Sequence, residues 1–184
     1  MLLVRVHNSV FHGIQRLLDD WAIGTAARVV FAGVLFVYFW NSAMTKIGDG
    51  LLGFLSPSVG AYAQILPKKM EAVSFDPSAL STLDHVIVYA GTYSEIILPI
   101  CIVVGLFTRL AAIGMIGFVA VMTWTDITQH GVDAATIGSW FDAQSGSAIA
   151  DQRSLWVFLL FALVVKGPGP LSLDALLGRM RGYN

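Results

Sequence analysis

Glu95 is the residue whose type and position most suggest chemistry, because it is an acid inside the apolar segment 86–107. In a helix that crosses a membrane, it would lie about nine residues, or roughly 13 Å, below the outer end. Inserting a charged side chain at such a depth costs on the order of 3 kcal/mol. Glu95 is therefore expected to be a catalytic residue that moves protons or anchors a ligand. The alternative is a polar clamp that holds two helices together.

A stripe of polar side chains in the preceding apolar segment offers Glu95 a partner surface. Its members recur at i, i+3, i+4, i+7 and i+8 of a helix, and they are Tyr38, Asn41, Ser42, Thr45 and Lys46. Polar atoms are costly against lipid, so the stripe should face an inward cavity near Glu95. This predicts ligand-binding roles for Tyr38, Asn41, Lys46 and the nearby Thr92. The alternative for Lys46 is that its ammonium reaches the membrane surface while the other groups bond locally.

Two histidines, His85 and His130, are expected near the same outer surface, with Asp84 and Asp126 close to them in sequence. Two imidazoles and two carboxylates can in principle hold a metal ion. The sequence has neither HxxH nor HxxxH spacing, and nothing in it brings the two positions together. We therefore predict a pair of surface histidines and no metal site.

Other candidates are an arginine and three tryptophans. Arg109 follows the second apolar segment, so it is expected at a turn and is a further candidate ligand-binding charge. Trp40, Trp124 and Trp156 fall near predicted outer helix ends, which is typical of an aromatic belt; stacking on a quinone is the alternative. The sequence contains no dinucleotide, P-loop, haem or iron–sulfur motif. If the protein is redox-linked, its electron carrier is expected to be a diffusing quinone or to lie on another subunit, with no covalently bound cofactor.

The composition indicates that lipid surrounds the elements that position these residues. The chain has 184 residues, of which 56% are hydrophobic and 12% charged, and its mean hydropathy is +0.72. Soluble domains carry about 25% charged residues. The net charge of −1 argues against a nucleic-acid partner. The expected partners are the lipid bilayer and a soluble or membrane redox protein, and a homo-oligomer is a further option.

We predict an all-α integral membrane four-helix bundle, with residues 1–184 forming a single membrane domain. The expected transmembrane helices are 28–46, 86–107, 110–125 and 148–166. Amphipathic helices at 9–24 and 172–181 should lie in the membrane interface. Residues 51–67 are too apolar for a solvated loop, so they are either re-entrant or surface-lying.

Basic residues predict the orientation of the bundle. The N-terminal segment, the turn near 105–109 and the tail carry Arg5, Arg16, Arg28, Arg109, Lys166, Arg179 and Arg181. The opposite side receives Lys46, Lys68, Lys69 and Arg153. Because short positively charged segments stay in the cytoplasm, both termini are expected to be cytoplasmic, in a bacterial inner membrane.

Three stretches of the sequence resemble the DoxX family of small four-helix membrane proteins. The first leads from Arg28 to Lys46, and the second runs from Glu95 through Gly105-Leu-Phe-Thr-Arg109-Leu-Ala-Ala. The third is Gly-Pro-Gly-Pro-Leu-Ser-Leu-Asp at 167–174. The resemblance implies a four-helix membrane bundle. It also points to relatives that are small subunits of thiosulfate:quinone oxidoreductase or membrane anchors of oxidative-stress enzyme complexes.

Two functions follow as hypotheses. In the first, the protein is a redox-linked subunit that handles a quinone or a small sulfur oxyanion in an outward-facing polar cavity. It would then be at most one subunit of a membrane oxidoreductase, such as a thiosulfate:quinone oxidoreductase-like complex. In the second, it is a non-catalytic membrane scaffold or assembly partner. Transport is a weaker third option, because the sequence shows no internal inverted repeat.

Overall fold

Four long apolar helices make up most of the structure, a computed structural model that describes residues 2–18, 21–48, 50 and 53–180. Within that part of the chain, the helices long and apolar enough to cross a membrane are Ala22–Met44, Thr82–Val104, Thr108–His130 and Ala148–Lys166. No strand is present among the described residues. The predicted all-α integral membrane bundle is thus confirmed, and the chain is a multi-pass membrane protein.

Three of these four helices contain a π-helical turn. The first consists of α2 (Ala22–Val30), the π-helical turn η1 (Phe31–Phe36) and α3 (Val37–Met44). The third is α7 (Thr108–Thr125) continued by η4 (Asp126–His130), and the fourth is η5 (Ala148–Arg153) continued by α9 (Ser154–Lys166).

The second long helix, α6 (Thr82–Val104), begins earlier than the sequence pattern indicated. Ser81 and Asp84 form a capping box at its start, which satisfies N–H groups that the first turn leaves free. Gly105 ends the helix in the left-handed conformation, with φ of 73°. The earlier start places Glu95 about 13 residues, or roughly 20 Å, from the N-terminal end of α6. The acid is therefore further from the start of its helix than the sequence alone suggested.

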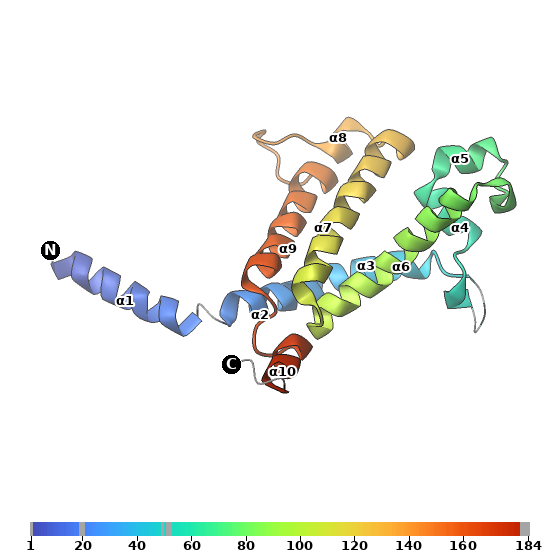
Figure 1. The fold of residues 1–184 in the computed structure, drawn as a ribbon. Coiled ribbons are helices and arrows are strands. Elements are labelled where there is room, and N and C mark those ends of the chain that lie inside the picture. Colours follow the sequence, from blue (N-terminus) through green and yellow to red (C-terminus); the bar gives the residue numbers. More distant parts are fainter. Residues whose placement is uncertain (1, 19–20, 49, 51–52, 181–184) are drawn as a thin grey trace.

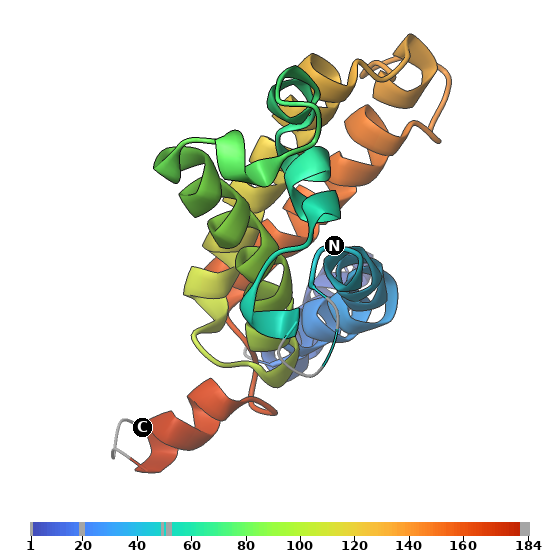
Figure 2. The same cartoon turned by 90° about the vertical axis from the view of Figure 1, so that its right-hand side faces the viewer.

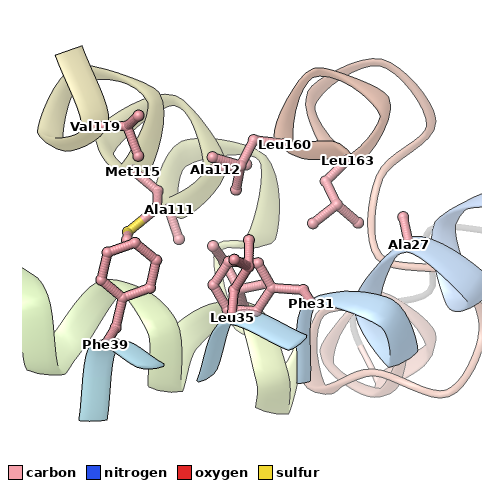
Figure 3. Close-up of a cluster of buried hydrophobic side chains, with 11 residues drawn as sticks. Ala27, Phe31, Leu35, Phe39, Ala111, Ala112, Met115, Val119, Leu160 and Leu163 are labelled. Carbon is pink, nitrogen blue, oxygen red and sulfur yellow. The ribbon is translucent and has the colours of Figure 1, made fainter. Parts of the chain in front are cut away.

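The helices pack in a closed ring. α9 packs against both α7 and α2, and α6 packs against α7 and α3. Figure 3 shows the core between them, where rings and branched side chains of the first helix meet α7 and α9. The members without any exposed surface include Phe31, Phe39, Ala112, Met115, Leu160 and Leu163.

Residues 53–79 cover the N-terminal half of α6. The end of the bundle where α6 begins is named the outer end, and the opposite end, at Gly105, the inner end. Residues 53–79 form η2 (Gly53–Leu55), α4 (Val59–Ile65), α5 (Pro67–Ala72) and η3 (Pro77–Ala79). A small second core holds them on α6 and consists of Ala61, Tyr62, Met70 and Val88. Of the segment 51–67 considered above, residues 51–52 lie outside the described residues.

Short helices flank the bundle at its two ends. α8 (Ala134–Ile137) lies at one end and α10 (Leu173–Met180) at the other (Figures 1 and 2). α1 (Leu2–Leu18) extends away from the bundle. It begins before the expected residue 9 because Leu3 and Val6 continue its apolar spacing. Residues 19–20 of the expected helix 9–24, and residue 181 of the expected tail helix, lie outside the described part of the chain.

Candidate functional site: a membrane cavity at a buried ion pair

A cavity of about 880 Å³ opens beside Glu95, between α3, α6 and α7. α4 and α5 contribute its outer wall through Gln64, Ile65, Leu66 and Lys69. Its deeper wall is largely apolar, interrupted by the polar side chains of Tyr38, Ser42, Lys46, Ser94 and Glu95. A concave, largely apolar space with a few converging polar groups is the usual form of a small-molecule site.

The most buried charges on the cavity wall are Lys46 and Glu95. Lys46 Nζ lies 2.8 Å from Glu95 Oε2, and the two side chains are only 9% and 2% exposed. The ammonium also donates hydrogen bonds to Ser42 Oγ at 2.8 Å and to the Ser42 carbonyl at 3.2 Å. Oε2 accepts no well-directed hydrogen bond, so its contact with Lys46 is a charge pairing.

Lys46 therefore points inward rather than to the membrane surface. It follows the C-terminal end of α3, and its side chain reaches back by one turn to Ser42. Helical side chains lean toward the N-terminus of their helix, which directs an ammonium at this position into the bundle. An acid at membrane depth is commonly paired in this way.

The predicted stripe is only partly turned to the cavity. Tyr38, Ser42 and Lys46 line it, whereas Asn41 and Thr45 are exposed. At 100° per residue, Asn41 and Lys46 differ by about 140° around the helix, which is too wide for one inward-facing side.

The other two predicted ligand-binding residues lie away from the cavity wall. Thr92 is buried one turn from Glu95, and its hydroxyl has no hydrogen-bond partner. Arg109 lies at the opposite end of the bundle, with its guanidinium beside Gly167.

A second ion pair at the cavity joins Asp126 of η4 to Arg153 of η5. Arg153 is buried and also donates a hydrogen bond of 2.9 Å to Thr123 Oγ1. Asp126 is part of the cavity wall. The sequence pattern did not indicate this pair as part of the site, although each residue is an isolated charge near the end of an apolar segment.

Trp156 packs inside the bundle against two rings of the first helix, tilted to one and edge-on to the other. Its ring lies 5.3 Å from that of Tyr38 and 5.9 Å from that of Phe39. This partly buried tryptophan thus packs against the first helix at the level of the cavity.

Comparison with known proteins agrees with the fold. The family model described as DoxX matches residues 23–127. The chain belongs to the DoxX family. The matched stretch contains Arg28, both members of the Lys46–Glu95 pair and the turn before Arg109. No match was found among curated proteins or among solved structures.

Both candidate metal-binding histidines of this DoxX chain bond to α4. His85 Nδ1 lies 2.7 Å from the Tyr62 hydroxyl, and His130 Nε2 lies 2.9 Å from the Gln64 carbonyl oxygen. Burial, with a smaller contribution from Tyr89, raises the pKa of Tyr62, which keeps its hydroxyl protonated. No group of three His, Cys, Asp or Glu side chains that could hold a metal occurs within the described ranges.

Two lysines of α5 extend the same attachment. Lys69 forms an ion pair with Asp84 at the start of α6. Lys68 Nζ donates a hydrogen bond of 2.7 Å to the carbonyl oxygen of Thr128 in η4. With the two histidines, these contacts hold α4 and α5 across the outer ends of α6 and α7. The segment 59–72 is called the cover below.

The inner end of this DoxX bundle is closed by the segment 167–174. The Arg28 guanidinium donates to the carbonyl oxygens of Ile102, Val103, Pro168 and Leu171. The Asp174 carboxylate accepts hydrogen bonds from the backbone N–H groups of Phe107 and Thr108 at 2.7 and 2.8 Å. These charged groups satisfy backbone atoms at the ends of α6 and α7, so they have a structural role.

Proposed function

We propose that this DoxX protein is a redox-linked membrane subunit whose cavity binds the head group of a quinone. The observation that carries the proposal is the Lys46–Glu95 pair on the wall of a largely apolar cavity. Lys46 and Tyr38 supply N–H and O–H donors for a quinone carbonyl. Glu95 supplies a carboxylate that accepts a proton when the bound quinol is oxidised.

The charge of the cavity favours a neutral quinone over a free sulfur oxyanion. The Lys46 ammonium is compensated by Glu95, the Lys69 ammonium by Asp84, and the Arg153 guanidinium by Asp126. An anion entering this space would lose its hydration and meet no uncompensated cation among these pairs. A neutral ring with polar edges incurs a much smaller desolvation penalty.

Electrons must leave the site through a partner. Oxidation of a quinol releases two electrons and two protons, and the sequence carries no motif for a resident electron carrier. We therefore propose a soluble or membrane redox protein as the electron acceptor. The chain would then be one subunit of a membrane oxidoreductase. In a thiosulfate:quinone oxidoreductase-like complex the same site would run in reverse, with the partner supplying electrons to the quinone and Glu95 donating a proton to it.

The alternative of a non-catalytic scaffold is favoured by α1. This helix extends from the bundle and exposes Leu3, Val10 and Phe11 among its apolar residues. Such a helix can lie in the membrane interface or dock on a partner. A homo-oligomer formed through these surfaces belongs to the same alternative.

We also propose that the protein lies in a bacterial inner membrane with both termini in the cytoplasm. The support is the excess of basic residues on the short segments at one end of the bundle. Arg28 contacts the segment 167–174 there, and Arg109 lies beside Gly167. In this orientation the cavity is in the outward half of the membrane.

The test is quinone binding by purified protein in lipid nanodiscs. The wild type should retain quinone through purification, and Lys46→Met and Glu95→Gln should each weaken binding by about tenfold or more. Asn41→Ala is the matched control, because Asn41 is on the same helix but outside the cavity wall. Wild type without quinone, or unchanged binding by all variants, would contradict the proposal. Displacement of quinone by thiosulfate would instead favour the oxyanion.

Loss of binding must be separated from loss of fold. A single substitution leaves one buried charge unpaired, which can destabilise the bundle. The double variant Lys46→Met/Glu95→Met removes both charges, so it should remain folded and still fail to bind quinone. Its unfolding transition in detergent checks the first part of this expectation.

A further inference from the structure

The cavity is open toward the surrounding lipid between α6 and α7. Several residues of its wall from these two helices have large exposed fractions, namely Ile87 (40% exposed), Val121 (63%) and Trp124 (59%). Both helices cross the membrane, so what lies outside this opening is hydrocarbon.

Small residues create this opening. Ala90 and Ser94 line the cavity from α6, and Gly114 and Gly117 line it from α7, whereas Gly91 faces Ile65 of the cover. At Gly114 the helices are close, since an added Cβ would lie 3.1 Å from Leu98. One turn further outward, a Cβ at Gly117 would meet nothing within 4 Å. Figure 1 shows α6 and α7 diverging in this direction from their shared turn.

On the side toward water, the cavity is covered by a segment of the chain. There the cover of α4 and α5 is fastened to both walls, by Tyr62–His85 and Lys69–Asp84 on α6 and by Gln64–His130 on η4. The structure thus has a bonded segment on one side of the cavity and, between α6 and α7, a groove in which an added Cβ at Gly117 meets no neighbour. A ligand that partitions into the bilayer has the more direct path.

We propose that the ligand is a long-tailed isoprenoid quinone that enters sideways from the bilayer, and that its tail stays in the groove between Gly117 and Ala90. The inference rests on the proposed function, since it assigns the head group to the Lys46–Glu95 pair. The groove is continuous with the cavity that contains that pair, so one amphiphilic molecule can fill both. The tail then contributes affinity through buried apolar surface.

The test compares a long-tailed quinone with its tailless head group in nanodiscs. Gly117→Leu places a side chain in the groove, and Gly33→Leu is the matched control. Gly33 is exposed in the first membrane helix, and its added Cβ also meets nothing within 4 Å. Gly117→Leu should lower the binding affinity for the long-tailed quinone by about tenfold. Its affinity for the tailless quinone should stay within about twofold of the wild type. Gly33→Leu should change neither of these two affinities.

Outcomes separate this inference from the function on which it rests. If binding depends on Lys46 and Glu95 but Gly117→Leu leaves the long-tailed quinone unaffected, the side opening is not the tail site and only this inference is overturned. The same holds if the wild type binds the tailless quinone as tightly as the long-tailed one. If the wild type binds neither quinone, both proposals are overturned.

A second measurement does not depend on how a variant folds. A quinone that carries a photoreactive group on its tail should label peptides from 82–104 and 108–130 of the wild type. Labelling confined to α9, or equal labelling by a photoreactive phospholipid at the same positions, would contradict a specific tail site.

Discussion

Lys46 and Glu95 are each poor residues for an apolar bundle when considered alone, and their pairing makes both tolerable. Replacing one of them leaves the other buried and unpaired, whereas replacing both leaves an apolar contact. We expect Lys46→Met and Glu95→Met each to lower the free energy of unfolding by about 3 kcal/mol, and the double variant to lose less than the sum. Unfolding in mixed detergent measures all three. Strictly additive losses would mean that the two charges do not interact.

At the inner end of the bundle, Arg28 is a charged residue with a structural role. Its planar guanidinium joins two segments that are far apart in the sequence. Lysine retains the charge but lacks the fork that reaches several carbonyl oxygens at once. Arg28→Lys should therefore reduce stability by about 2 kcal/mol. The control is Arg179→Lys, at an exposed position of α10, which should be neutral. Equal stability of the two variants would refute a structural role for Arg28.

At the scale of elements, the turn between α6 and α7 depends on a glycine. Gly105 has φ of 73°, and a Cβ there would lie 2.5 Å from Ser172 Cβ. Gly105→Ala should cost at least about 1 kcal/mol in thermal unfolding experiments, because of both the left-handed backbone and the clash. Gly33→Ala has no clash and should be neutral or slightly stabilising. A neutral Gly105→Ala would show that segment 167–174 does not pack on this turn.

The cover of α4 and α5 is a separate element whose attachment is mostly polar. Lys69→Met removes its ion pair with Asp84, so backbone amides of 59–72 should exchange with deuterium faster, while those of α7 stay unchanged. Glu71→Gln, an exposed change on the same helix, is the control. If exchange in the cover is equally slow in both variants, the apolar contacts around Met70 hold it without the ion pair.

For the whole molecule, the proposed orientation can be tested with two reporters. A fluorescent protein at the C-terminus should be fluorescent in living cells, and alkaline phosphatase inserted within the exposed loop 142–146 should be active. The reverse pattern would place the cavity in the inner half of the membrane. The proton released by Glu95 would then go to the cytoplasm.

The sequence by itself determined the class of this molecule. Hydropathy and length identified four membrane helices, the acid at membrane depth marked Glu95, and three motifs indicated the DoxX family. These features are local, because they depend on residues within one helix or one turn. For the same reason the helix ends shifted by several residues, since capping by Ser81 starts α6 before the apolar pattern and the left-handed Gly105 ends it within that pattern.

Only the tertiary structure decided which polar groups share the cavity. Spacing placed Asn41 and Lys46 on one stripe, but the rotation of the helix against α6 turned only Lys46 inward. Contacts such as Asp126 with Arg153, or α4 with the outer ends of α6 and α7, join residues distant in sequence. Helix rotation and long-range pairing come from packing the whole bundle, so no single segment encodes them. The opening toward lipid beside Gly117 has the same origin, because it exists only where α6 and α7 diverge.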